Sequence, residues 1–176
     1  MKTLKYITTV AIAVLCSYNL HAQNKKQQKE AAVKSMVESK NFDFVAQYAN
    51  PLGGRQRYLD FGYDVRIKPD SVISYLPYFG QITFDPPIYP TDDGIKFTST
   101  RYGYQTITNK RGSYIITITP TDAKYIQKLI FTISSEGYTT LQVTITNRYA
   151  ISYDGYITEN KNADKVASAQ QSAKNH

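Results

Sequence analysis

Between Phe42 and Thr158 the sequence alternates apolar and polar residues with a period of two, and this pattern limits the folds open to the chain. The clearest run is Arg57 to Lys68. Large apolar residues fall on one face of this run, namely Leu59, Phe61, Tyr63, Val65 and Ile67. Because successive side chains of a β-strand point to opposite faces, the run predicts a strand with one face on a core and the other in water.

Short segments of the same kind recur along the chain. They are Phe42–Ala49, Arg57–Lys68, Ser71–Gly80, Ile95–Ser99, Tyr102–Thr108, Ser113–Thr119, Ile126–Ser134, Tyr138–Thr146 and Ile151–Thr158. Turns such as Lys68–Ser71 and Asn109–Gly112 indicate consecutive hairpins. We therefore predict an all-β, antiparallel, up-and-down domain at residues 41–158, barrel-like in the manner of a lipocalin, with about eight or nine strands. Closure would remove exposed sheet edges.

The segments on either side of this domain differ in composition. Residues 23–40 begin polar and then place Val33, Met36 and Val37 at helical spacing, which predicts an amphipathic helix from about Gln27 to Lys40. Its apolar stripe is narrow, so we expect the helix to dock on the β domain. Residues 159–176 are polar and contain no aromatic residue, which predicts a disordered tail.

Residues 1–22 have the features of a secretory signal peptide. Lys2 and Lys5 form a short positive region ahead of an apolar run, Tyr6 to Leu15, that is too short to span a bilayer. Leu20-His21-Ala22 then resembles a signal-peptidase site. The sequence therefore predicts cleavage after Ala22 and a periplasmic or secreted protein with no transmembrane segment after cleavage.

The alternative is an outer-membrane lipoprotein anchored through Cys16, although lipidation favours a small residue where Leu15 stands. If the signal peptide is removed, the mature chain keeps no cysteine, and its one histidine is His176 at the end of the tail. Zinc and copper sites and Ser-His-Asp or Cys-His nucleophiles rely on His or Cys. We therefore expect no metal site, no cofactor and no enzymatic activity.

The charge of the chain is mildly positive. It falls from +7 to +5 when Lys2 and Lys5 leave with the signal peptide. The remaining basic residues are scattered along strand faces and turns, without a recognisable nucleic-acid-binding module. We expect a solvated surface and no nucleic-acid partner.

Several motifs occur together in the order and spacing of a known family. They are Ala49-Asn50-Pro51-Leu52-Gly53-Gly54, then Tyr75-Leu76-Pro77-Tyr78-Phe79-Gly80, then Asn147-Arg148 with Ile151-Ser152-Tyr153 and Gly155-Tyr156-Ile157. With them the chain resembles family 4251 of domains of unknown function, small exported proteins of Gram-negative gut anaerobes. The likeness extends over about Lys34 to Thr158, and Tyr-Phe-Gly is its most specific mark. The resemblance implies a signal peptide and one antiparallel, barrel-like β domain, but no activity and no site residues.

The segment Ser71 to Gly80 carries large apolar groups on both alternating faces, so both faces are expected to be covered. In a structural interpretation, one face enters the barrel and the N-terminal helix or the proline-rich loop Asp85–Gly94 covers the other. In a functional interpretation, Tyr78 and Phe79 lie at the barrel mouth, with that loop as a flap over a small ligand. The candidate ligand-binding residues are Tyr75, Tyr78, Phe79, Tyr89, Arg148 and Tyr153.

These features favour a monomeric, non-catalytic binding protein for a small amphipathic ligand or an envelope partner. The first alternative is a structural or inhibitory protein-interaction module with no small ligand. The second is a carboxylate-dependent enzyme, which needs two acids within reach of each other in a cleft. A large internal void would favour a small ligand, and a solid interior with an exposed aromatic patch would favour a protein partner. The bulky residues predicted to face inward favour a filled interior.

Overall fold

Ten β-strands and one helix make up the part of the chain that the computed structural model describes, which comprises residues 25–60, 62–81, 94–110 and 112–160. The helix spans residues 25–39. The strands are β1 (Phe42–Pro51), β2 (Arg57–Tyr58), β3 (Asp64–Ile67), β4 (Val72–Leu76), β5 (Ile95–Ser99), β6 (Tyr102–Thr108), β7 (Tyr114–Pro120), β8 (Ile126–Ile133), β9 (Tyr138–Ile145) and β10 (Ile151–Thr158). The predicted signal peptide with Cys16, most of the proline-rich loop with Tyr89, and residues 161–176 of the predicted tail lie outside the described residues.

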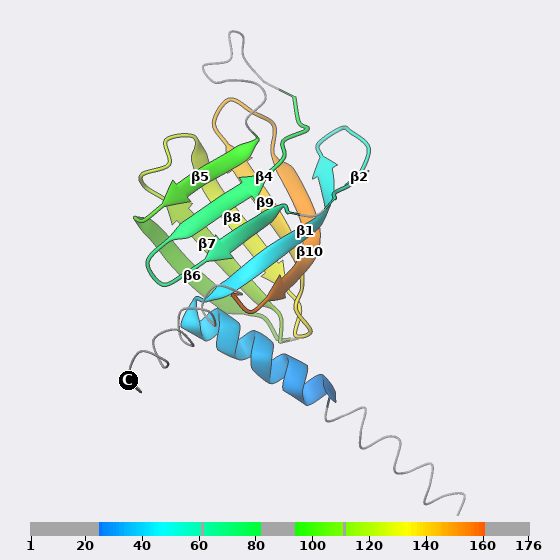
Figure 1. Cartoon of the computed structure of the whole chain (residues 1–176), viewed down its shortest axis with the longest axis vertical. Coiled ribbons are helices and arrows are strands. Elements are labelled where there is room, and N and C mark those ends of the chain that lie inside the picture. The colour runs from blue at the N-terminus through cyan, green and yellow to red at the C-terminus, as the bar shows by residue number, and fades with distance from the viewer. Residues whose placement is uncertain (1–24, 61, 82–93, 111, 161–176) are drawn as a thin grey trace, which may run out of the picture.

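The strands form one antiparallel sheet that curls into a nearly closed barrel (Figure 1). Their order is β5-β4-β3-β1-β10-β9-β8-β7-β6, with β2 paired to β1 off this path. The first long strand, β1, therefore pairs with the last, β10. By contrast β5 and β6 do not pair, although only two residues join them. The predicted class of fold is confirmed, and the break in the barrel falls between β5 and β6.

Local sequence sets the turns of the hairpins. Across Pro69-Asp70, the Lys68 N–H donates to the Ser71 carbonyl at 2.8 Å, and the Ser71 N–H donates back to the Lys68 carbonyl at 3.4 Å. Before β9, Gly137 adopts a φ of 90°, which costs glycine little. The turn at Lys68–Ser71 occurs where the sequence predicted it.

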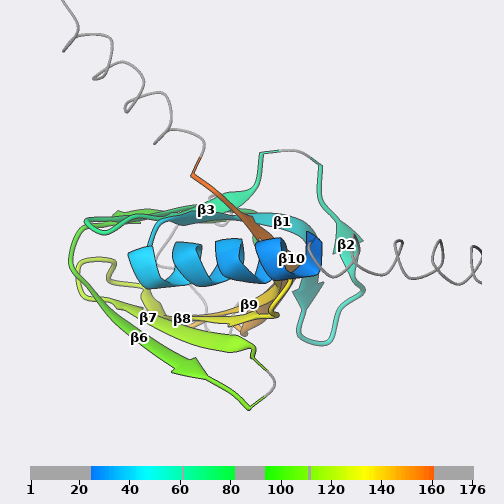
Figure 2. The same ribbon diagram turned by 90° about the horizontal axis from the view of Figure 1, so that it is seen from below.

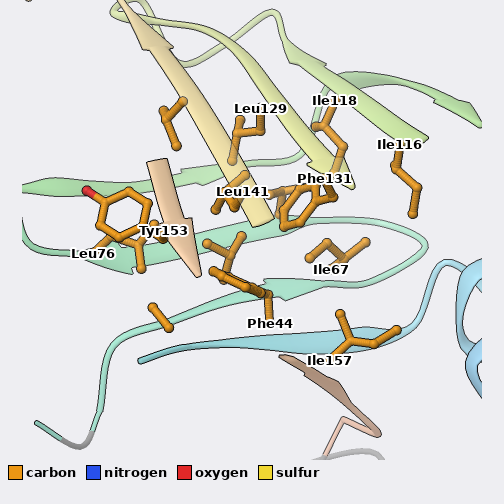
Figure 3. Close-up of a cluster of buried hydrophobic side chains, with 14 of the residues drawn as sticks. Phe44, Ile67, Leu76, Ile116, Ile118, Leu129, Phe131, Leu141, Tyr153 and Ile157 are labelled. Atoms are coloured by element: carbon orange, nitrogen blue, oxygen red, sulfur yellow. The ribbon is translucent and has the colours of Figure 1, made fainter. Parts of the chain in front are cut away.

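Apolar side chains from facing strands meet inside the barrel (Figure 3). The Phe131 ring lies edge-on to Phe42 at 6.2 Å and to Phe44 at 5.8 Å between ring centroids. Further fully buried residues are Val65, Ile67, Val72, Ile116, Ile118, Leu129, Ile133, Leu141 and Val143. Burial of one such side chain contributes about 1.5–3 kcal/mol. Bulky side chains therefore occupy the interior, as the inward-facing positions predicted.

The N-terminal helix lies across one end of the barrel, between the two curled parts of the sheet (Figure 2). Its predicted apolar stripe, Val33, Met36 and Val37, is buried. The helix ends where Lys40 adopts a left-handed φ of 52° and Asn41 donates its N–H to the Met36 carbonyl at 3.2 Å, as in a Schellman motif. The predicted helix and its docking are confirmed, but the helix covers the end of the barrel and not the outer face of β4.

The structure corrects the prediction of one continuous strand over Arg57–Lys68. Residues 59–63 separate β2 from β3. This segment has more residues than the partner strand β1: between the pairs Tyr58–Tyr48 and Asp64–Val45 it has five residues, whereas β1 has two. Leu59 donates its N–H to the Gln47 carbonyl at 2.8 Å, and Gly62 bends the chain with a φ of 101°. Extra residues of this kind leave no trace in the apolar alternation of the segment.

Candidate functional site

The predicted element Tyr78-Phe79-Gly80 folds back on itself directly after β4. The Tyr78 hydroxyl donates toward two carbonyl oxygens, that of Gln81 at 3.0 Å and that of Tyr149 at 2.9 Å. The Tyr78 ring lies so close to Gly80 that any Cβ there would collide with it. The guanidinium carbon of Arg148 lies 4.9 Å from the centre of the same ring. We call this arrangement the Tyr78 latch, because it ties the end of β4 to the β9–β10 connection.

Tyr153 lies in the core behind this latch. It is fully buried, and its hydroxyl donates to the Pro77 carbonyl oxygen at 2.6 Å. Burial raises the pKa of the Tyr153 hydroxyl well above its usual range, and the nearby Tyr78 acts in the same direction. Burial also raises the pKa of Tyr78, although the Arg148 charge opposes this. Both hydroxyls therefore remain protonated near neutral pH and act as hydrogen-bond donors.

Tyr75 and Phe79 lie on the outer surface. The Tyr75 ring stacks on Tyr63, with 5.8 Å between centroids and 11° between planes, and the Lys96 ammonium lies 5.0 Å from its centre. The Arg57 guanidinium lies 4.7 Å from the centre of the Phe79 ring. The predicted site residues within the described chain are thus divided between the latch, the core and the outer surface, and these contacts partly cover the outer face of β4.

A groove of about 430 Å³ opens at the break in the barrel, beside β5. One wall is formed by residues 94–98, which are Gly94 and the first four residues of β5. The opposite wall is formed by residues 122–126 of the β7–β8 connection and the start of β8, with Ile145 and Arg148 completing the lining. We call it the β5 groove. Of the residues predicted as a binding site, Arg148 lines this groove.

Asp122 ties the β5–β6 turn to one wall of the groove. Its carboxylate accepts hydrogen bonds from the Ser99 hydroxyl, from the Thr100 N–H at 3.0 Å and from the Arg101 N–H at 3.1 Å. These bonds, that from Ser99 foremost, lower the pKa of the Asp122 carboxyl from 3.8 to about 2. In addition, the Thr121 N–H donates to the Arg101 carbonyl at 2.8 Å. The turn is therefore anchored to the β7–β8 connection, while the far edge of β5 is left to the groove.

Positive charge and apolar surface dominate the β5 groove. Lys96, Lys124 and Arg148 line it, and none of these three cations forms an ion pair within the described chain. Among the described lining residues Asp122 is the one carboxylate, and both of its oxygens accept hydrogen bonds. A concave site lined by one sign of charge attracts the opposite charge. The groove therefore suits an anionic group attached to an apolar body.

Neither metal sites nor membrane-spanning helices are found among the residues that the structure describes. No group of three or more His, Cys, Asp or Glu side chains is placed to hold a metal ion in that part of the chain. The one helix among the described residues, at 25–39, is not long and apolar enough to cross a membrane.

Sequence reasoning missed most of the β5 groove. Lys96 belongs to a predicted strand and Lys124 to a predicted loop, and their separation in the chain hides that they share a groove. The one local signal was the short loop around Asp122, whose side chain suits turns and backbone N–H groups.

The fold and the groove together define a class: a small antiparallel β-barrel with a helix across one end and, among the described strands, an open seam between β5 and β6. Comparison with family models goes further, because the model described as "Domain of unknown function (DUF4251)" matches residues 24–157. The chain belongs to this family, as its motifs predicted.

One solved relative confirms the architecture. The crystal structure of a DUF4251 family protein from Bacteroides eggerthii DSM 20697 aligns with a TM-score of 0.56, covering 74% of this chain and 87% of that chain at 14% sequence identity. At that identity the likeness shows the fold alone. No functionally curated protein matches the chain.

Proposed function

We propose that the protein is an exported, non-catalytic binding protein, and that the β5 groove binds a ligand in which an anionic group is joined to an apolar body. The observation that carries the proposal is the groove itself, about 430 Å³ in volume, where Lys96, Lys124 and Arg148 border apolar walls. Ligand sites of roughly 300–1,000 Å³ typically combine an apolar lining with a few placed polar groups.

The chemistry of the groove supports binding without catalysis. With a pKa of about 2 and hydrogen bonds to both oxygens, the Asp122 carboxylate is a poor general base near neutral pH. The hydroxyls of Tyr78 and Tyr153 already donate to backbone carbonyls. Export is supported by the signal-peptide features of residues 1–22, which would place the binding site in the periplasm or outside the cell.

Isothermal titration calorimetry with decanoate tests the proposal, with decanol as the uncharged analogue. We expect decanoate to bind and decanol to bind about tenfold more weakly, a difference of roughly 1.4 kcal/mol. The double variant Lys96→Gln/Lys124→Gln should weaken decanoate binding to the level of decanol. Lys128→Gln is the matched control, since Lys128 is exposed on β8 and does not line the groove. No binding of decanoate, or an equal loss in the control, would contradict the proposal.

A second candidate function is a protein-interaction module with no small ligand. The filled interior favours it, as do exposed aromatic side chains on the outer face. Tyr48 and Tyr58 are 39% and 66% exposed, and their rings meet at 5.6 Å between centroids on β1 and β2. If a stoichiometric protein co-purifies from the native envelope and Tyr58→Ala abolishes its capture, this alternative replaces the first.

A further inference from the structure

We infer that the ligand of the β5 groove is an extended peptide with alternating apolar and acidic residues, which adds to the free edge of β5 as an extra strand. The inference rests on the proposed function and names the class of its ligand. It depends on three features of the molecule: the unpaired edge of β5, the course of the groove along that edge, and the charge of its walls.

One edge of β5 is unpaired within the described chain. Its other edge pairs with β4 from Ile95 opposite Leu76 to Ser99 opposite Val72. On the far side no described strand joins β5, because the sheet ends there. In an antiparallel strand, alternate residues direct their N–H and C=O groups to each edge, so β5 presents a row of backbone donors and acceptors away from β4. Such a row is a template for another strand.

The groove follows this edge and not one face of the sheet. Its wall includes residues 94–98 in unbroken succession. Successive side chains point to opposite faces, as the buried Ile95 and the exposed Lys96 show. The groove is lined by consecutive residues whose side chains point to the inner and the outer face in turn. It therefore runs along the edge of the strand, where the backbone is accessible. The other sheet edge, β6, contributes no residue to the groove.

The walls select the sequence of the added strand. On its inner side, alternate residues would face the apolar surface of Ile126 and Ile145. On its outer side, the intervening residues would lie beside Lys96, within reach of Lys124 and Arg148. Opposite charges across neighbouring strands stabilise pairing, whereas like charges oppose it. An alternating apolar and acidic peptide meets both requirements.

The same charges disfavour a second copy of this chain as the occupant. A two-fold dimer built by pairing β5 with β5 would use the same patch twice. It would bring Lys96, Lys124 and Arg148 of one copy toward the same cations of the other. The repulsion favours an acidic partner from another molecule.

The experiment uses the mature protein and the five-residue probe Val-Glu-Val-Glu-Val, acetylated, amidated and dye-labelled, which matches the five residues of β5. Fluorescence anisotropy measures its affinity. Val-Lys-Val-Lys-Val is the charge-reversed probe. We expect the acidic probe to bind and the basic probe to bind at least about tenfold more weakly.

Backbone methylation separates strand addition from simple charge attraction. Two analogues of the acidic probe carry N-methyl groups, one on the valine amides and the other on the glutamate amides. In an added strand one of these sets of N–H groups faces β5 and the other faces away. We expect one analogue to lose at least about tenfold in affinity, the equivalent of roughly one hydrogen bond or more, and the other to stay within about threefold. If both analogues lose affinity to the same extent, or if neither loses affinity, the inference is overturned.

A charge-swap variant locates the peptide. Lys96→Glu/Lys124→Glu should reverse the preference and bind the basic probe, whereas the control Lys128→Glu should leave it unchanged. If decanoate binds with the expected charge dependence but the acidic peptide does not, the inference is overturned and the proposed function stands. If neither binds, both are overturned. A dimer of the ligand-free protein that dissociates on the Lys96→Glu change would assign the edge to a second copy and also overturn the inference.

Discussion

Gly155 lies in the seam between β10 and β1, and its replacement by alanine should open that seam. A Cβ at this position would lie 1.9 Å from the Val45 carbonyl oxygen and 3.1 Å from the Phe44 ring, whereas ordinary contact begins near 3.4 Å. The two backbones would have to separate by about 1.5 Å. The atom in the way belongs to the backbone of β1. This strand pairs with β10 on one side and with β3 on the other, so its displacement would disrupt strand pairing.

The cost follows from this displacement. Two ladder hydrogen bonds lost near the site would remove about 0.5–1.5 kcal/mol each, and overpacking adds about 1–3 kcal/mol. Gly155→Ala should therefore lower the free energy of unfolding by about 4 kcal/mol. For a chain of 176 residues each kcal/mol corresponds to about 2–4 °C in Tm, so the expected fall is about 8–16 °C.

Urea unfolding followed by far-ultraviolet circular dichroism measures the effect, with Gly103→Ala as the matched control. Gly103 is also a strand glycine, on β6, but a Cβ there would meet nothing nearer than 3.9 Å. Its replacement should be neutral or stabilising by up to about 1 kcal/mol, because alanine restricts the unfolded chain. A Gly155→Ala protein within about 1 kcal/mol of wild type, with an unchanged m-value, would refute the register of the seam.

Three further predictions concern the latch and the β5–β6 turn. Tyr153→Phe should lower the free energy of unfolding by about 1–3 kcal/mol, because the Pro77 carbonyl loses its donor; unchanged urea unfolding would contradict this. The low pKa of Asp122 adds stability that is present above about pH 4 and is lost as the pH falls through about 2. The Tm difference between wild type and Asp122→Asn should therefore shrink over that interval, and a constant difference would count against it. Gly80→Ala and Tyr78→Phe should be non-additive in a double-mutant cycle, because the alanine displaces the same hydroxyl; additive losses would show that the latch is not one unit.

Local patterns were enough to predict the strands that lie far from irregular pairing. In β9 the alternation places Leu141, Val143 and Ile145 on one face, and all three are buried. The prediction failed over Arg57–Lys68, because five residues of this segment lie between its pairs with β1 at Tyr58 and Asp64, where β1 has two. Alternation reports on the strand that carries it and not on its neighbour.

The candidate site was predictable to a smaller degree. Arg148 was identified because a cation between two strands can hold an anion, and it does line the groove. Tyr153 was predicted at a binding surface but is buried, since its hydroxyl meets the carbonyl of Pro77, 76 residues away in the chain. A tyrosine has an apolar ring and a polar tip, so it suits a core position or a surface equally well until its partner is known.

By itself, the sequence determined that this chain forms an antiparallel, barrel-like β domain with a docked N-terminal helix. Alternation, helical spacing and turn chemistry are local properties, and short stretches of residues encode them. Tertiary structure alone decided that β1 closes against β10, that Asp122 anchors the β5–β6 turn, and that the edge of β5 opens into a basic groove. Those features depend on pairing between distant segments, and the free energy of such pairing is set by contacts across space that no local pattern contains.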